Sequence, residues 1–547
     1  MALWRFLQPP PAYSLRITQL TFDPGLTGWP AISPDGLTVA YVSDRDTGNN
    51  LELYVQPARG GSPVRLTSDS TNWYGPVFSP DASSLAISDG VGIYTVPVAG
   101  GQPHLLAASG RSPQYSPDGR WITYSDAEGA RIIASTGGTG RPFHPELHIA
   151  GTPAWSPDGK KLIFWTPDDL KVAPLEGGTV ESTGIGPHLT KAGLAGGPYD
   201  DTLWTGYGLI FSARTEFARN LYLCPLGRDG QAGGNLVQLT NGTDLIGNPS
   251  ISREGRLVFS SGRQRFDIWG VPLDSASGKA KGPAYRITNT LAPTANPDLS
   301  ADGKRLIFGS SHNGFTEIWE KDLTTGKERV AVTGPEGASY GRLLKSSSEI
   351  LHVRPAAGRN EVYIGNHKLT VAARPWDANR NATNVLVSGS GIEQWNVQTG
   401  ALVPVISAPA PAILSDASFS PDDRWVVFVE TAKDHSQVYA LPAQGGKWRQ
   451  ITKDSAKAGK PRFSPDGGLI YFTLDRDGSR EIDAVRFDTR SGEIAGEPFA
   501  VFRSEAPRLS LLLVNPQALD IAVGRDKLAT IFCEQSSTIW LGDLVLH

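Results

Sequence analysis

The chain has 547 residues, a formal net charge of -4 and a pI near 6.2, so it is too long for one ordinary domain and lacks the positive charge that nucleic-acid binding requires. No run of about 20 apolar residues occurs in it, and the sequence therefore predicts no membrane span. Its 61 glycines and 41 prolines are spread among short apolar runs, which is typical of an all-β protein with many turns.

The start of the chain differs from the rest. Residues 1–13 contain an apolar run followed by three consecutive prolines and are predicted to be a linker or the tail of a preceding segment. Whether the natural protein begins before Met1 is left open. Ser14 to Thr21 has the pattern of the last strand of a repeat although it precedes the first repeat. It is therefore predicted to close a sheet formed elsewhere in the chain, since such closure removes an open sheet edge.

One stretch recurs along the chain, and Thr152 to Phe164 represents it: an apolar strand, a Ser-Pro-Asp-Gly turn and a second apolar strand. Proline fixes φ and the residues after it tolerate positive φ, so each copy predicts a hairpin. A third apolar run such as Ile268 to Val271, a Gly-Gly turn and a short strand ending in Leu-Thr or Ile-Thr complete four strands. Intact copies of the Ser-Pro-Asp turn begin at Ser33, Ser79, Ser116, Ser156, Ser420 and Ser464.

The order Pro-x-aromatic-Ser-Pro-Asp-Gly, strand, Ile-Tyr/Trp-Val, Gly-Gly, Leu-Thr resembles the TolB-type, WD-repeat-like propeller repeat from about Leu15 onward. The resemblance implies a β-propeller, similar to the carboxy-terminal propeller domains of bacterial transmembrane regulators and kinases. The copies number about twelve four-stranded blades at periods of about 37 to 48 residues. Two six-bladed rings, residues 14–278 and 279–547, are the favoured arrangement, and one large ring or an unequal split are the alternatives.

In the two-ring scheme the polar stretch Asp274 to Pro283 is the crossing between rings, and Tyr285 to Thr288 closes the last blade. The first three strands of that blade are then predicted at residues 520–523, 527–532 and 538–541. Ser14 to Thr21 closes the sixth blade of the first ring.

The motifs with chemical potential have structural interpretations. The Asp of each Ser-Pro-Asp turn is predicted to accept local backbone hydrogen bonds, and Cys224 and Cys533 are predicted to be buried thiols. His144 and His148 have the spacing of a zinc-binding helix, but Pro145 follows the first histidine, so a loop with two possible ligand contacts is favoured. Because no hydrolase elbow, phosphate loop or metal cluster is found, no catalytic residue, metal or cofactor is predicted.

Propellers bind ligands at one end of the central channel, through the loops that enter the innermost strands. The residues predicted to contact a ligand or partner there are Trp29, Trp73, Tyr74, Arg111, His144, His148, Tyr199, Tyr340 and Trp376. Packing between blades is the alternative role for each aromatic residue.

The hypothesis from these patterns is a non-enzymatic sensor or scaffold that binds an unknown protein, peptide or glycan, as the carboxy-terminal part of a bacterial regulator. The alternatives are a peptidase-related or lyase-like propeller enzyme with its chemistry at the channel mouth, and a TolB-like periplasmic envelope protein. A periplasmic or extracytoplasmic location is expected, with the cytoplasm as the alternative.

Overall fold

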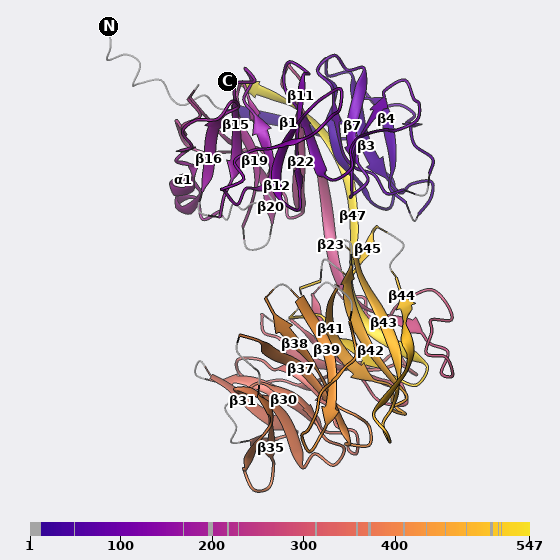
Figure 1. Cartoon of the computed structure of the whole chain (residues 1–547). Coiled ribbons are helices and arrows are strands. Elements are labelled where there is room, and N and C mark those ends of the chain that lie inside the picture. Colours follow the sequence, from indigo (N-terminus) through magenta and orange to yellow (C-terminus); the bar gives the residue numbers. More distant parts are fainter. Residues whose placement is uncertain are drawn as a thin grey trace. The chain divides into compact units, whose positions relative to one another are not determined.

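The computed structural model describes residues 13–546 except 49, 70, 168, 195–200, 216–217, 228, 291, 312–313, 357–358, 370–372, 408–410, 434, 454–455, 477–478, 504–506, 512–513 and 516. Nearly all regular structure in these residues is β-strand (Figure 1). Within the same residues one helix occurs, α1 (Ile185–Lys191), which has seven residues. The predicted all-β propeller class is confirmed.

The Ser-Pro-Asp turns form the hairpins through one repeated set of hydrogen bonds. At the first turn the Ser33 hydroxyl donates to the Asp35 carboxylate (2.5 Å), which also accepts the N–H of Leu37 (3.0 Å), while Ser33 Oγ accepts the N–H of Thr38 (2.9 Å). The serine hydroxyl is the main cause that lowers the pKa of Asp35. The same bonds recur at Ser79, Ser116, Ser156, Ser300, Ser420 and Ser464. The structural interpretation of these aspartates is confirmed.

Contacts between residues divide the chain into two compact units. The first unit comprises Met1–Gln264, Ala506–Arg508 and Gln535–His547, and the second comprises Arg265–Glu505 and Leu509–Glu534. In many sheets the second strand is apolar along most of its length because neighbouring sheets cover both of its faces. In the first unit, for example, Val39, Ala40, Tyr41 and Val42 are all fully buried.

Four sheets of the first unit have four strands each, paired in chain order. They are β2 (Thr27–Ile32), β3 (Thr38–Ser43), β4 (Glu52–Pro57) and β5 (Val64–Arg65); β6 (Tyr74–Phe78), β7 (Ser84–Ser88), β8 (Ile93–Pro97) and β9 (His104–Ala107); β10 (Arg111–Tyr115), β11 (Trp121–Asp126), β12 (Gly129–Ala134) and β13 (Arg141–Pro142); and β14 (Ala150–Trp155), β15 (Lys161–Trp165), β16 (Leu170–Pro174) and β17 (Glu181–Ser182).

Five sheets of the second unit have the same four-stranded order. They are β25 (Thr294–Leu299), β26 (Arg305–Ser310), β27 (Glu317–Asp322) and β28 (Glu328–Val332); β29 (Ser339–Leu343), β30 (Ile350–Ala356), β31 (Arg359–Ile364) and β32 (His367–Leu369); β33 (Pro375–Ala378), β34 (Asn384–Ser388), β35 (Gly391–Asn396) and β36 (Leu402–Ser407); β37 (Ile413–Phe419), β38 (Trp425–Ala432), β39 (His435–Pro442) and β40 (Arg449–Gln450); and β41 (Lys457–Phe463), β42 (Leu469–Arg476), β43 (Ser479–Asp488) and β44 (Glu493–Phe502).

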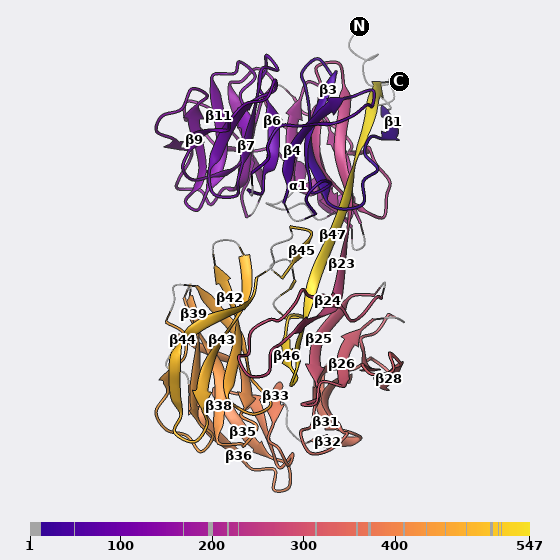
Figure 2. The same cartoon turned by 90° about the vertical axis from the view of Figure 1, so that its right-hand side faces the viewer.

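The remaining strands form one 11-stranded sheet. It contains β1 (Tyr13–Gln19), β18 (Thr202–Thr205), β19 (Gly208–Arg214), β20 (Arg219–Cys224), β21 (Val237–Gln238), β22 (Leu245–Ile251), β23 (Arg256–Pro272), β24 (Tyr285–Arg286), β45 (Leu509–Ser510), β46 (Ile521–Val523) and β47 (Lys527–Leu546). The two longest strands, β23 and β47, pair with each other in this sheet (Figure 2). Each begins in one unit and ends in the other.

These two strands correct the strand assignment at the end of the chain. The prediction that residues 527–532 and 538–541 are separate strands is wrong, because β47 is continuous from Lys527 to Leu546. The intervening Glu534 to Ser537 contains no glycine, proline or asparagine to make a turn. Ile268 to Val271 likewise continues β23 without a turn. Gly262 lies within β23, where a Cβ atom would come 2.9 Å from Ser536 O, so this glycine permits close approach of β47.

Strand β1 from the start of the chain pairs with β47 from its end, as the sequence predicts for Ser14 to Thr21. β1 pairs antiparallel with the last part of β47, from Tyr13 opposite Leu546 to Gln19 opposite Trp540. Because the sheet runs in the order β1, β47, β23, β22, the early strand covers the outer edge of the blade that begins at β22.

The first strands of the sheets form a closed circle of contacts in each unit. In the first unit the circle runs β2, β6, β10, β14, β18, β22 and back to β2. In the second unit β25 contacts β29, the β29–β30 hairpin contacts β33, and the circle continues through β37, β41 and β46 back to β25. We propose on these contacts that each unit is one six-bladed ring. The sequence places the division between residues 278 and 279, whereas the compact units divide at Gln264 and Glu534, because β23 and β47 are shared.

Candidate functional site

The innermost strands share a bulge that re-aims one side chain. Pairing between the first and second strands shifts register at this point in ten sheets. At this bulge, the residue four positions before the turn serine commonly has a positive φ. In sheets that lack the serine, the position is counted from the residue that replaces it. The non-glycine examples are Trp29, Ser112, Asn248, Asn296, Tyr340, Asp416 and Lys460. Bulges with such residues turn a side chain away from the regular alternation of a strand.

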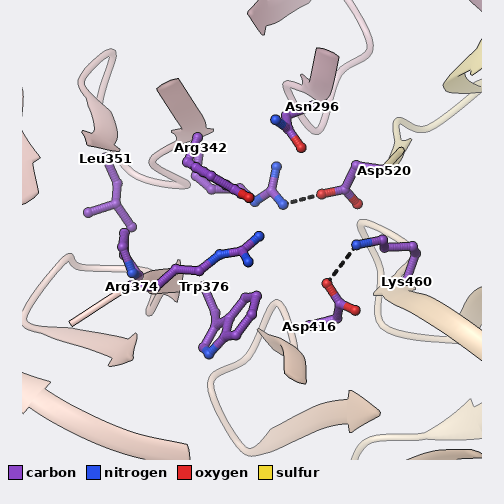
Figure 3. A pocket seen from close by; sticks show the side chains of 10 residues that line it. Asn296, Arg342, Leu351, Arg374, Trp376, Asp416, Lys460 and Asp520 are labelled. Carbon is purple, nitrogen blue, oxygen red and sulfur yellow. Dashed lines mark hydrogen bonds and ion pairs between the residues drawn. The ribbon is translucent and has the colours of Figure 1, made fainter. Parts of the chain in front are cut away.

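In the second unit these positions surround a small pocket, which we call the inner pocket (Figure 3). It is lined by Asn296, Tyr340, Arg342, Leu351, Arg374, Pro375, Trp376, Asp416, Lys460 and Asp520. Nine of these residues lie on or next to the first strands of six sheets, and Leu351 lies on the second strand β30, so six sheets contribute to one site. The free volume between the side chains is about 10 Å³, the room that one water molecule occupies.

Most charges of the inner pocket are paired. Asp520, 4% exposed, accepts hydrogen bonds from Arg342 and from Arg462 (2.8 Å). These two guanidinium groups, with Lys460, outweigh the cost of burial and lower the pKa of Asp520 to about 2. Lys460 in turn pairs with Asp416 at 2.9 Å. The pocket therefore holds a network of charge-assisted hydrogen bonds that fixes its side chains.

A further carboxylate, Asp298, does not line the pocket but interacts with the lining residue Arg342. It accepts the backbone N–H of Leu343 at 2.7 Å. Burial raises its pKa to about 6, although Arg342 and the hydrogen bond from Leu343 act in the opposite direction. Asp298 therefore gains or loses its proton near neutral pH.

Arg374 is the exception among the charged lining residues. Its guanidinium carbon lies 4.1 Å from the ring centroid of Tyr340 and 4.5 Å from that of Trp376. Figure 3 shows this guanidinium extending toward the middle of the pocket. Its side chain has no ion pair and no hydrogen bond with any residue that the structure describes, and its Nε atom is buried. A cation held between two aromatic faces is thus presented without a carboxylate partner.

A larger groove lies elsewhere in the second unit, with a volume of about 730 Å³. Its walls come from β40, β42, β43 and β44 and the segments next to them, including Ile451, Phe472 and Ile494. Arg503 and Arg476, which also line it, both approach Glu481, at 3.1 and 3.8 Å. Unlike the inner pocket, this groove draws on two neighbouring blades and not on the whole circle of first strands.

Three of the predicted contact residues of the first unit lie close together around two sheets. Trp29 and Tyr74 are partly buried and meet edge to face, with ring centroids 5.5 Å apart. Trp73 is 2% exposed, packs edge to face on Tyr94 at 5.2 Å, and donates its indole N–H to Asp69 at 3.2 Å. Trp73 is therefore a core residue here, and a contact with a partner stays a prediction for Trp29 and Tyr74.

Three other predicted residues lie elsewhere in the first unit. Arg111 and His148 are exposed, while His144 pairs with Glu146 at 2.7 Å and packs on Phe143. Tyr199 lies outside the described residues. Among the residues described, no group of three or more His, Cys, Asp or Glu side chains is placed to hold a metal ion. In the same part of the chain, no helix has the length and apolar character needed to cross a membrane.

The structure brings together Tyr340 and Trp376, through their shared contact with Arg374. The charged residues of the inner pocket were missed by the sequence interpretation. A signal was present, because counting four residues back from each turn finds Asn296, Asp416, Lys460 and Asp520. Cys224 and Cys533 are both buried free thiols, which confirms their predicted state.

Comparison with known proteins supports the repeat assignment. Residues 13–172 match the family model for the TolB beta propeller domain. The chain is 30% identical over 175 residues to the uncharacterized protein Atu1656 of Agrobacterium fabrum, covering 28% of this chain and 59% of that protein. It is 28% identical over 145 residues to the uncharacterized peptidase YuxL of Bacillus subtilis, covering 25% of this chain and 21% of that protein. The chain thus spans less than two thirds of the length of these curated relatives.

Two solved structures align with this chain at low sequence identity. A TolB structure from Agrobacterium tumefaciens aligns with a TM-score of 0.37 and 14% identity, over 50% of this chain and 99% of that one. The crystal structure of the tricorn protease aligns with a TM-score of 0.32 and 15% identity, over 92% of this chain and 54% of that one. The family model identifies residues 13–172 as TolB-type β-propeller repeats, and the repeated four-stranded sheets make the chain a β-propeller protein.

Proposed function

We propose that this chain is a non-enzymatic recognition protein that binds a protein or peptide partner at the inner pocket of the second unit. The observation that carries the proposal is the convergence of side chains from six sheets on one site that combines two aromatic faces with an unpaired guanidinium. Aromatic and arginine side chains are the residues that contribute most binding energy in protein interfaces.

The state of the charged groups also favours binding over catalysis. With a pKa of about 2, Asp520 is a weak base at neutral pH, and both of its arginine partners are occupied in holding it. The pair of Lys460 and Asp416 is satisfied in the same way. Such a network suits a preorganised recognition surface, whose side chains lose little freedom when a partner binds.

An enzyme is the second candidate, and one residue favours it. Asp298 has a pKa of about 6, within the range of a general acid or base at neutral pH. A segment of the chain also matches a protein named an uncharacterized peptidase, over 21% of that protein. In this case the chemistry would occur at the same pocket, with Asp298 as the proton-transferring group.

The biological setting is part of the proposal. The TolB-type repeats of residues 13–172 support a role as a bacterial sensor or scaffold in the periplasm or another extracytoplasmic space. In this role the chain is either the carboxy-terminal part of a regulator or a TolB-like envelope protein. A glycan is the alternative ligand, since aromatic faces also stack on sugar rings.

A selection experiment tests where the chain binds. Random peptides displayed on phage are selected against the purified chain, and the dissociation constants of the enriched peptides are measured for the wild type, Trp376→Ala and Trp29→Ala. Trp29 is the control because it is also a partly buried tryptophan at the bulge of a first strand, but in the first unit. We expect Trp376→Ala to weaken binding at least tenfold and Trp29→Ala to leave it unchanged.

The opposite pattern, with loss in Trp29→Ala alone, would place recognition in the first unit and contradict the proposal. Hydrolysis of the same peptides that is abolished by Asp298→Asn would replace the binding function with the enzymatic one. Thermal unfolding of both tryptophan variants shows whether a loss of binding reflects a loss of folding.

A further inference from the structure

We propose that the inner pocket binds a carboxylate group of the partner and that Arg374 is the residue that holds it. This inference rests on the proposed function and names the chemistry that the site recognises. It concerns one group of the partner, either the carboxyl terminus of a peptide or the side chain of an Asp or Glu.

The first step is the geometry of Arg374. Tyr340 and Trp376 lie 4.1 and 4.5 Å from its guanidinium carbon, so two rings fix the side chain and cover its faces. The N–H groups of a guanidinium lie in its plane, and their edge therefore stays available for a planar acceptor. Because no described residue accepts a hydrogen bond from this side chain, these donors are available to a ligand.

The second step is the balance of charge. The pocket lining contains three cations, Arg342, Arg374 and Lys460, against two carboxylates, Asp416 and Asp520. Arg342 and Lys460 are already paired, so the surplus positive charge lies on Arg374. Close to the lining, Arg462 and Lys345 add two positive charges, which Asp298 and Asp377 offset when both are ionised. One surplus positive charge is neutralised by a monoanion, and a carboxylate is the monoanion that proteins carry.

The third step is size. The free volume of about 10 Å³ is close to the space of one water molecule. A carboxylate oxygen needs about as much room as a water molecule, and a carboxylate can make two parallel hydrogen bonds to the guanidinium edge. A phosphate group is larger and carries more negative charge at neutral pH, so it fits this site less well.

Three sets of fluorescein-labelled hexapeptides with otherwise random sequence distinguish the sources of the carboxylate. The first set has a free carboxyl terminus and no acidic residue, the second has an amidated terminus and one internal Asp or Glu, and the third is amidated and free of acidic residues. Binding to the full chain is measured by fluorescence anisotropy, with acetate and inorganic phosphate as competitors. We expect one of the first two sets to bind at least tenfold more tightly than the third, and acetate to compete better than phosphate.

Substitutions then assign the interaction to Arg374. Arg374→Gln is expected to remove the tenfold preference, and Arg374→Lys is expected to restore little of it, since lysine keeps the charge and lacks the planar pair of donors. Arg380→Gln, on an exposed residue near the same strand, is the control and should leave the preference intact. Thermal unfolding confirms that the variants fold.

Each outcome separates this inference from the proposed function. Equal binding of all three sets that is lost in Trp376→Ala would overturn the carboxylate inference and leave partner binding at the pocket in place. Stronger competition by phosphate would overturn it as well. An unchanged preference in Arg374→Gln would show that another residue binds the carboxylate. If none of the three sets binds, both the inference and the peptide-binding function are contradicted.

Discussion

Replacing Asp298 with asparagine is expected to stabilise the folded chain at neutral pH, which is an unusual result for a residue at the centre of a site. Burial disfavours the ionised form of this carboxylate and raises its pKa to about 6 from 3.8. The folded state therefore holds a proton that the unfolded state has lost between these two pH values. Stability falls as the pH rises through this window, and the loss is complete above it.

The magnitude follows from the two pKa values. One pKa unit corresponds to about 1.4 kcal/mol, so keeping Asp298 ionised above pH 7 costs the folded state up to about 3 kcal/mol. Asparagine keeps an oxygen that can accept the N–H of Leu343 and carries no charge. For a unit of this size, 1 kcal/mol corresponds to roughly 2 to 4 °C in the unfolding temperature. Asp298→Asn should therefore raise the unfolding temperature by about 6 to 12 °C at pH 7.5 and by much less at pH 4.

Asp520→Asn is the matched control, because it removes a carboxylate from the same site with the opposite effect. The two arginines that hold Asp520 lower its pKa to about 2 from 3.8, so its stabilising contribution is present above pH 4 and is lost as the pH falls toward 2. Differential scanning calorimetry of both variants at pH 4 and pH 7.5 checks the reasoning. If Asp298→Asn is no more stable than the wild type at pH 7.5, or if both substitutions destabilise the chain equally, the electrostatic account of the pocket is refuted.

Three further predictions concern packing, closure and the thiols. Trp73→Ala should cost about 3 to 5 kcal/mol in urea unfolding, as for other buried aromatic residues, whereas Trp29→Ala, at a partly exposed position, should cost less; equal costs would contradict the core position of Trp73. Directly after β1, the bond from Leu20 N to Ile539 O sets the alternation of the ladder, so Arg16→Pro removes a hydrogen bond to β47 and Ile17→Pro does not. Arg16→Pro should therefore be less stable by about 1 kcal/mol, and the reverse order in thermal unfolding would refute the register. Burial raises the pKa of both cysteine thiols, to about 11 and about 12, so neither should react with a thiol reagent at pH 8 until the chain unfolds.

The repeat could be predicted from the sequence because its signals are local. A Ser-Pro-Asp turn between two apolar runs specifies its own hairpin through hydrogen bonds within six residues, as at Ser33. The pairing of Ser14 to Thr21 with a distant sheet could be predicted for the same reason. Its pattern is that of the last strand of a repeat, and no other strands of a repeat precede it in the sequence.

The exchange of strands between the two units could not be predicted in this way. Whether β47 turns at Glu534 or continues depends on the partner strand beside it. Gly262 resembles a turn residue in the sequence, although in the structure it allows β23 and β47 to approach closely. The sequence does not distinguish Trp73 from Trp376. Packing places Trp73 in a core and Trp376 in the lining of a pocket. Arg374 gave no local signal, because its surroundings come from strands that are distant along the chain.

A crystal structure of the full chain with the tightest free-carboxylate or acidic hexapeptide tests the central claim most directly. We predict that the peptide lies on the inner pocket of the second unit, with one of its carboxylates within hydrogen-bond distance of the Arg374 guanidinium and the pair of Arg342 and Asp520 unchanged. A peptide bound at Trp29 in the first unit, or along the groove beside β44, would contradict this account.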